Sequence, residues 1–226
     1  MANRIQTSPR QQSNAEHRSH VLRKVMEILS FKGYAKVSMT DLATVAGVRR
    51  SALQSTLGTR DEILRAAIHF CADTEASLAY EPLRVSATGR EAIAAMLEEN
   101  IRLHRYWPRN CGCLLTINSF MIPPEDMGLQ EFLTDRRRSL AKQIRSRLVQ
   151  SVKEGELANG TNCEALANLC LAVLIGLTTR ISDGTPTALI FRSIEAFVNG
   201  LGFNAVADDA RPRASRPRKV NRETEP

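Results

Sequence analysis

The chain has 226 residues, 43% of them hydrophobic, which is enough for one or two folded domains, and its formal net charge is +7. The polar first 20 residues lack the apolar core of a secretory signal, and five cysteines without paired spacing argue against a disulfide framework. The longest apolar stretch, residues 166–177, is interrupted by Asn168 and is too short to span a bilayer, so we expect a cytoplasmic protein without a membrane segment.

Positive charge is concentrated at the N-terminal end of the chain. Residues 1–60 hold ten Lys or Arg against three Asp or Glu, whereas residues 61–204 hold fifteen against seventeen. The segment from residue 205 holds six against four. A basic module attracts phosphate, which favours a nucleic acid as partner, although an acidic protein or membrane surface is the alternative.

The N-terminal elements carry the most specific pattern. Residues 1–14 are polar and predict a flexible arm, and an apolar stripe from residue 15 to Gly33 predicts a first helix. Residues 38–57, SMTDLATVAGVRRSALQSTL, then have the spacing of a helix-turn-helix. Ser38 and Asp41 form a capping box, and Gly47 lies where the chain must turn. An ordinary helical hairpin is the alternative interpretation.

The rest of the chain also has the pattern of helices. Thr59 is expected to cap the next helix, whose acidic first turn contains Asp61 and Glu62. Further helices are expected at residues 91–106, 113–121, 129–152, 163–181 and 187–201, with Pro or Gly between them. No segment alternates as a strand does, so we expect an all-α fold followed by a disordered basic tail at residues 205–226.

The order of these elements resembles the TetR (tetracycline-repressor) family of bacterial transcriptional regulators. The matching segments are 33–34 (GY), 37–43 (VSMTDLA), 46–48 (AGV), 52–53 (AL) and 58–62 (GTRDE), all in the basic module, with 112–115 (GCLL) beyond it. The resemblance implies a three-helix DNA-binding domain at residues 15–68 and a larger helical effector-binding and dimerisation domain at 69–204. It further implies a homodimeric repressor that a small-molecule effector releases from double-stranded operator DNA, an inverted repeat.

One segment departs from the family pattern. The family's recognition helix usually ends with an aromatic residue, a variable residue, a histidine and an aromatic residue, where this chain has Gln54, Ser55, Thr56 and Leu57. Gln54 and Thr56 can still hydrogen-bond a phosphate or a base edge. The departure keeps a second hypothesis open, namely a dimeric small-molecule-binding protein with weakened DNA binding.

We expect the DNA contacts to come from the helix-turn-helix and the helix starts beside it. Arg49 and Arg50 begin the recognition helix, and we expect one to read a base and the other to hold a phosphate. Residues at helix starts suit phosphate contacts because free backbone amides lie there. The full set is Thr40, Arg49, Arg50, Ser51, Gln54, Ser55, Thr56, Thr59 and Arg60. For each arginine the alternative is a solvated surface charge.

A mostly apolar effector pocket is expected in the larger domain, although core packing is the alternative for each member. Its candidate residues are Met96, Ile101, His104, Trp107, Leu114, Ile117, Asn118, Phe120 and Met121. Cys111 and Cys113 lie at an expected helix start near two arginines, which stabilises a thiolate, so a thiol-based redox or electrophile sensor is a variant hypothesis. A buried, inert cysteine is the alternative. The His and Cys spacing does not suit a metal site, and we expect no cofactor.

The last two helices are more apolar than a monomer surface requires. We therefore expect a four-helix dimer interface that contains Ala172, Ile175, Gly176, Phe191, Ile194 and Phe197. Such a dimer places its recognition helices roughly 34–36 Å apart, or a multiple of that distance. We do not expect an enzyme, because the sequence has no glycine-rich phosphate loop, nucleophile elbow or paired metal motif.

Overall fold

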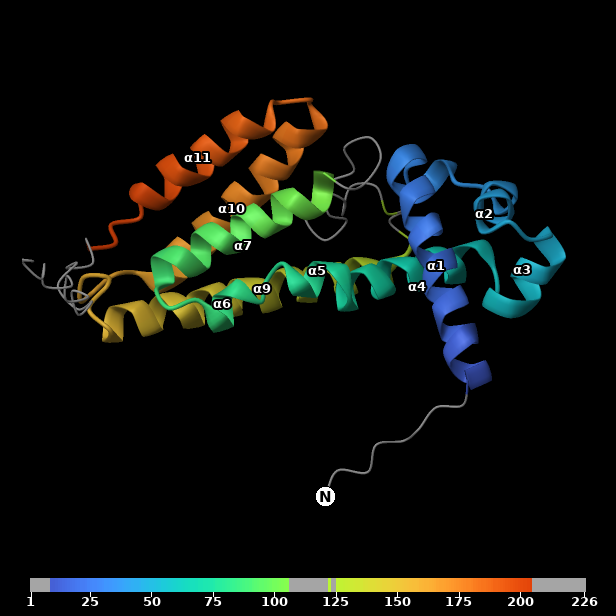
Figure 1. Cartoon of the computed structure of the whole chain (residues 1–226), viewed down its shortest axis with the longest axis horizontal. Helices are drawn as coiled ribbons and strands as arrows, with labels where there is room; N and C mark the ends of the chain where they lie inside the picture. Colours follow the sequence, from blue (N-terminus) through green and yellow to red (C-terminus); the bar gives the residue numbers. More distant parts are fainter. Residues whose placement is uncertain (1–8, 106–121, 123–124, 205–226) are drawn as a thin grey trace, which may run out of the picture.

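The computed structural model describes residues 9–105, 122 and 125–204, and these residues form helices and turns without a strand. The N-terminal helices are α1 (Pro9–Lys32), the 3-10 helix η1 (Tyr34–Lys36), α2 (Met39–Ala46), α3 (Arg50–Leu57) and α4 (Arg60–Asp73). They are followed by α5 (Glu75–Leu78), α6 (Pro82–Val85), α7 (Gly89–Arg105), α9 (Met127–Lys153), α10 (Cys163–Ser182) and α11 (Thr187–Asn199). The helices α1 to α3 form one end of an elongated molecule, and α7, α9, α10 and α11 form the other (Figure 1). The expected all-α fold is confirmed.

The N-terminal helix and the segment before α7 differ most from the sequence prediction, while the other helix ends differ by one or two residues. Helix α1 begins at Pro9 rather than near residue 15, so residues 9–14 belong to the helix and not to an arm. Proline suits a first helical position because its missing N–H needs no partner there. Two short helices, α5 and α6, occupy the segment before α7, where the sequence analysis expected no helix. The helix expected at 113–121 and the tail from 205 lie outside the described residues.

Side-chain caps fix both ends of the helix-turn-helix. Ser38 Oγ accepts the Asp41 N–H at 3.1 Å, and the Asp41 carboxylate accepts the Ser38 N–H at 2.9 Å, so the predicted capping box is confirmed. A second capping box joins Thr59 and Glu62 at the start of α4. Between α2 and α3, Gly47 has a left-handed conformation with φ 67°, which L side chains rarely adopt.

The described residues form two hydrophobic cores, and α9 belongs to both. The first core joins α1, α2, α3 and α4, and it also contains Leu129 and Leu133 of α9. The second joins α7, α9, α10 and α11, and contains Leu140 and Leu148 of α9. The domain boundary expected at residue 69 falls inside α4, whose Ala72 still packs in the first core. Helix α9 therefore connects the two cores directly, while α4 leads from the first core through α5 and α6 to α7.

Helix α10 is long and apolar enough to span a membrane by length and composition alone. This corrects the sequence estimate, which considered only residues 166–177, because the helix extends over 20 residues. A core helix meets the same criteria, and α10 buries Cys170, Leu174 and Leu177 in the second core. Only 28% of its most apolar 18-residue segment is buried, however, so α10 has apolar surface that the described residues do not cover.

Candidate nucleic-acid interface

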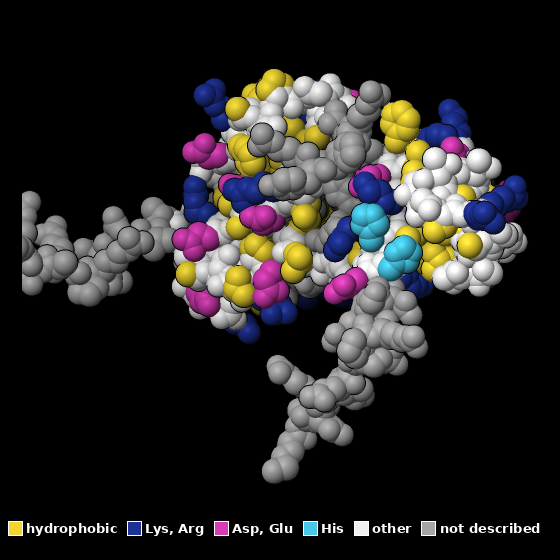
Figure 2. All heavy atoms as spheres, turned by 45° about the vertical axis from the view of Figure 1, so that its right-hand side comes forward, with side chains coloured by type: hydrophobic (Ala, Val, Ile, Leu, Met, Phe, Trp, Pro, Cys, Tyr) yellow, Lys and Arg dark blue, Asp and Glu magenta, His cyan; other side chains and the backbone are white. Residues whose placement is uncertain are grey.

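Helix α3 lies at one end of the molecule (Figure 1), and most of its side chains are exposed and polar. Within this helix only Leu53 is buried, while Arg50, Ser51 and Gln54 are exposed, and so is Arg49 at the N-cap. The Arg49 side chain does not cap the helix, so the first-turn amides of α3 remain available. Both arginines thus lie at the end of the helix that meets base edges in a helix-turn-helix complex. Lys and Arg side chains are spread over this end of the molecule (Figure 2).

Two of the hydroxyl groups of α3 are already engaged within the helix. Ser55 Oγ and Thr56 Oγ1 both donate to the Ala52 carbonyl oxygen, at 3.0 and 2.8 Å. Both side chains are exposed, but in this conformation each hydroxyl can only accept a hydrogen bond. They suit the amino group of a base better than a phosphate, which has only acceptors. The amide of Gln54 has no such restriction and remains the stronger candidate in this turn.

Two of the predicted DNA-contact residues lie at the starts of the helices on either side of α3. Thr40, in the first turn of α2, and Thr59, at the N-cap of α4, are both exposed. The sequence analysis missed Lys36 and Thr44, which are also exposed on this module. Lys36 lies two residues before the Ser38 cap, and its place in a basic segment just before a helix start was the signal that could have identified it.

Arg60 does not fit its predicted role as a phosphate contact. Its Nε donates to the Val37 carbonyl at 2.5 Å, and its Nη2 donates to the Tyr34 carbonyl. The guanidinium also lies 5.1 Å from the centre of the Tyr34 ring, and Nη1 pairs with Asp61. The side chain is therefore directed into the module, where it holds η1 against the start of α4. We correct its assignment from DNA contact to structural anchor.

Replacing Arg60 with alanine is expected to lower the free energy of unfolding by about 1–2 kcal/mol, because two carbonyls and an aromatic ring lose their cation. Urea unfolding followed by circular dichroism measures this change. Arg49→Ala is the matched control, since Arg49 is exposed and should change stability by less than about 0.5 kcal/mol. Equal unfolding midpoints for the two variants would contradict the anchor role.

The capping carboxylates of the module remain ionised far below neutral pH. Hydrogen bonds from Lys32, at 2.5 Å, and from Ser38 lower the pKa of Asp41 to about 2. Hydrogen bonds from Thr59 likewise lower the pKa of Glu62. A depressed pKa means that the caps stabilise the fold above the usual carboxyl range and lose this effect as the pH falls through the folded-state pKa. Both capping carboxylates are thus ionised at neutral pH, where the arginines of the module meet ionised phosphates.

The expected effector pocket lies mostly outside the described residues. Met96 and Ile101 are buried in the second core, at 0% and 1% exposure. His104 belongs to α7 but its side chain is not described, and Trp107, Leu114, Ile117, Asn118, Phe120 and Met121 fall outside the described ranges. The structure therefore describes the side chains of two of the nine candidate pocket residues, and both lie in the second core.

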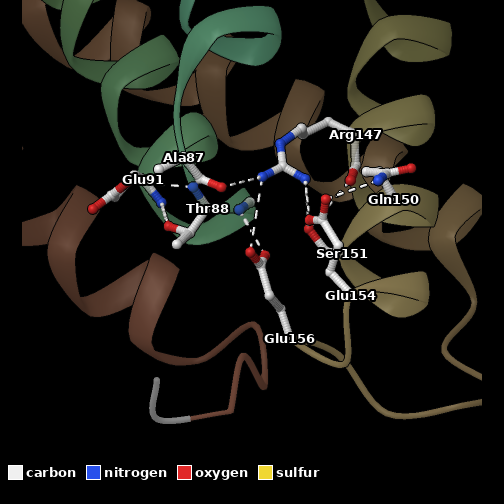
Figure 3. Close-up of polar contacts among 9 residues, drawn as sticks. Ala87, Thr88, Glu91, Arg147, Gln150, Ser151, Glu154 and Glu156 are labelled. Carbon is white, nitrogen blue, oxygen red and sulfur yellow. Dashed lines mark hydrogen bonds and ion pairs between the residues drawn. The ribbon is translucent and has the colours of Figure 1, made fainter. Parts of the chain in front are cut away.

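A groove of about 470 Å³ between α6 and α9 is lined by none of the predicted pocket residues. Its floor contains Arg147, whose side chain is only 9% exposed. Figure 3 shows this guanidinium among Glu154 at 3.2 Å, Glu156 at 3.8 Å and the Ala87 carbonyl at 3.4 Å. Two carboxylates surround this one cation, so the cluster has a net charge of −1, and its contacts fasten the turn before α7 to the end of α9.

The candidate thiols Cys111 and Cys113 also lie outside the described residues. Among the described cysteines, Cys163 and Cys170 are buried and Cys71 is half-buried. Burial raises the pKa of the Cys170 thiol to about 12, so it stays protonated and unreactive. No group of three or more His, Cys, Asp or Glu side chains in the described part of the chain is arranged to hold a metal ion.

The expected dimer residues are not all on the surface. Ala172 and Gly176 are exposed, and Ile175, Phe191 and Phe197 are half-buried. Ile194 is only 1% exposed and packs in the chain's own second core, so we remove it from the interface. Leu169 and Leu189, which the sequence analysis missed, are 48% and 51% exposed. The signal for Leu169 was the spacing of small and apolar residues at 165, 169, 172 and 176, which share one face of α10.

No protein-family model matches the sequence, and no curated protein matches it. Among solved structures, the chain is similar to a cysteine mutant of the TetR family regulator CifR complexed with a 26-bp operator DNA, with a TM-score of 0.73 and 23% identity over 81% of this chain and 96% of that one. AibR in complex with isovaleryl coenzyme A and operator DNA has a TM-score of 0.64 and 16% identity, over 83% and 98%. Reduced NemR from E. coli has a TM-score of 0.67 and 14% identity, over 85% and 99%. The chain therefore has the fold of TetR family transcriptional regulators.

Proposed function

We propose that this chain is a TetR family transcriptional regulator that binds an inverted-repeat operator as a homodimer and leaves it when a small-molecule effector binds. The observation that carries the proposal is the exposed polar face of α3, which begins with Arg49 and Arg50 and belongs to a helix-turn-helix capped at both ends. A helix of this kind fits the major groove, where an arginine fork reads guanine. The basic excess of residues 1–60 supports DNA as the partner.

A second copy of the chain is the partner that best fits α10 and α11. The exposed residues Leu169, Ala172 and Gly176 share one face of α10, and Leu189 is exposed on α11. Small residues let two helices approach closely, while exposed leucines gain from burial. Four helices, two from each copy, then form the interface and set the separation of the two recognition helices.

The effector is proposed to bind in the larger domain, in or beside the segment that follows α7. AibR, which shares the fold, was solved with isovaleryl coenzyme A, but the chemistry of the effector for this chain is left open. The effector acts by binding one conformation more tightly than the other, and we propose that it favours the one whose recognition helices do not match the operator. The regulator is then a repressor, working in the cytoplasm without enzymatic activity.

Weakened DNA binding remains the second candidate function. It is favoured by one observation, that the hydroxyls of Ser55 and Thr56 donate within α3 and so offer no hydrogen to a phosphate. In this case the protein is a dimer that binds a small molecule and has little affinity for any operator. Arg49, Arg50 and Gln54 are exposed and weigh against it.

Binding of the purified protein to DNA at two salt concentrations, with nonspecific competitor present, distinguishes the two functions. The probes are the intergenic DNA upstream of its own gene and a random-sequence duplex library. A footprint on an inverted repeat that resists competitor supports the regulator. Weak, strongly salt-dependent binding, with no sequence recovered from the library, contradicts the regulator and favours the ligand-binding protein.

A further inference from the structure

A single buried carboxylate joins the start of α9 to the N-terminal module. Asp126, the N-cap of α9, is only 9% exposed. Its Oδ2 accepts hydrogen bonds from Tyr34 Oη at 3.0 Å and from Arg65 Nε at 2.9 Å, while its Oδ1 accepts the Leu129 N–H at 3.2 Å. Tyr34 and Arg65 precede Asp126 by 92 and 61 residues. The group that caps α9 therefore also binds the helix-turn-helix module.

Both partners of Asp126 are firmly connected to the elements that carry the recognition helix. Tyr34 is 4% exposed in the first core, and Arg60 holds its carbonyl and that of Val37 next to the Ser38 cap of α2. Arg65 lies in α4, one turn after its start. A displacement of Asp126 is thus transmitted to α2 through Tyr34 and to α4 through Arg65.

The rest of α9 makes it suited to transmit such a displacement. It is one helix of 27 residues, with Leu129 and Leu133 in the first core and Leu140, Ile144 and Leu148 in the second. Two further contacts join it to α4. The rings of Phe132 and His69 have centroids 3.8 Å apart, and Arg136 pairs with Asp73.

The charge state of the contact is well defined at neutral pH. Burial disfavours the ionised form of Asp126, but hydrogen bonds from Arg65, the Leu129 N–H and Tyr34 outweigh it and hold the pKa of Asp126 below its usual value. Burial and the hydrogen bond to Asp126 raise the pKa of Tyr34 to about 12, with smaller effects from Asp61 and Arg65. The contact thus consists of an anion, a cation and a neutral donor.

We propose that Asp126 is a positioning residue for DNA binding, which fixes the angle of the helix-turn-helix against the larger domain through Tyr34 and Arg65. In a dimer this angle sets the separation of the two recognition helices, and so the operator half-site spacing that the protein prefers. The inference rests on the proposed function. It adds α9 to α4 as a route by which the larger domain controls the recognition helices.

Asp126→Asn tests the inference while keeping the helix start. Asparagine caps helices about as well as aspartate, so the bond to the Leu129 N–H can persist, but the charge that binds Arg65 is lost. The matched control is Asp135→Asn on the same helix, because Asp135 is 72% exposed and, among the described residues, pairs only with Arg138 at 3.1 Å. Tyr34→Phe is a second test variant that removes only the hydroxyl.

The probes are fluorescent duplexes of the inverted repeat that the native protein selects from a random library, with the spacer lengthened or shortened by one or two base pairs. The measured quantity is the ratio of the dissociation constants for the worst and the best spacer. We expect Asp126→Asn to reduce this ratio about tenfold, an effect within the range for a hydrogen bond to a charged group. Tyr34→Phe should reduce it in the same direction, and the double variant no further than Asp126→Asn alone.

If Asp126 has only a structural role, Asp126→Asn lowers the melting temperature but leaves the spacer preference intact. An unchanged spacer ratio in Asp126→Asn overturns the inference. If Asp126→Asn does not fold, an unchanged ratio in Tyr34→Phe overturns it instead. An equal reduction of the ratio in the control Asp135→Asn also overturns it. In those cases the native protein still binds its duplex, and the proposed function stands. A native protein that selects no duplex overturns the proposed function itself.

Discussion

Alanine at both Arg49 and Arg50 is expected to weaken binding to the inverted-repeat operator by about 100-fold or more. Both side chains are exposed at the start of α3, and neither caps the helix. A bidentate arginine–guanine contact contributes about 1–3 kcal/mol of discrimination, and a dimer makes each contact twice. Fluorescence anisotropy with the operator duplex and with a scrambled duplex measures the loss.

The two single variants separate the roles of the arginines. The variant that loses a base contact should relax the preference for one base pair in each half-site. The variant that loses a phosphate contact should weaken all sequences alike and reduce the slope of log K against log salt by about 2, one phosphate for each copy. Binding of a panel of single-base operator variants at several salt concentrations assigns each role.

Arg138→Ala is the control for net charge, since Arg138 is 71% exposed on α9 and pairs only with Asp135 among the contacts of the described residues. Arg138→Ala removes one positive charge from each copy, as each single arginine variant does. It should leave operator affinity within about twofold, because exposed charges farther away than a Debye length are screened. Operator affinity equal to the native value in Arg49→Ala and Arg50→Ala alike would exclude α3 as the recognition helix.

The N-terminal module was predictable because its signals are local in sequence. The box of Ser38 and Asp41 and the left-handed Gly47 each depend on residues within a few positions, and both features are present in the structure. The same local pattern placed Thr59 at a helix start, where it forms a second box with Glu62. Short-range hydrogen bonds and backbone sterics decide these features, so a single sequence contains the information.

Roles that depend on tertiary contacts were not predictable in this way. Arg60 has the composition and position of a phosphate contact, but its acceptors are the carbonyls of Tyr34 and Val37, 26 and 23 residues earlier. Asp126 follows two prolines and had no periodic pattern to mark it, yet its partners lie 61 and 92 residues away. Such pairings become visible only when the helices are packed.

The last two helices illustrate a different limit. Helices α10 and α11 are apolar on more than one face, so periodicity identifies apolar positions without showing which face meets the chain's own core. Ile194 proved to be a core residue, while Leu169 and Leu189 are the large apolar side chains left exposed on these helices. The exposure of each residue in the single chain separates core residues from candidate interface residues, because the residues that remain exposed are the ones available to a partner.

Ala172→Arg is expected to convert the proposed dimer to a monomer at micromolar concentration and to weaken operator binding by about 100-fold or more. Ala172 is exposed at the middle of the face that also contains Leu169 and Gly176. An arginine there brings two like charges together across a symmetric interface and must be desolvated, both of which oppose association. The loss of linked binding at two half-sites then reduces avidity by about 10²–10⁴.

Sedimentation velocity measures the mass, and anisotropy with the operator measures the affinity. Ser146→Arg is the matched control, since Ser146 is exposed on α9 in the groove beside α6, and should change neither quantity. Because Ala172 is exposed in the single chain, the substitution leaves both hydrophobic cores intact, and a native-like circular dichroism spectrum is expected. A dimer of native mass in Ala172→Arg places the interface elsewhere, whereas a folded monomer that still binds one half-site shows that dimerisation and DNA recognition reside in separate parts of this chain.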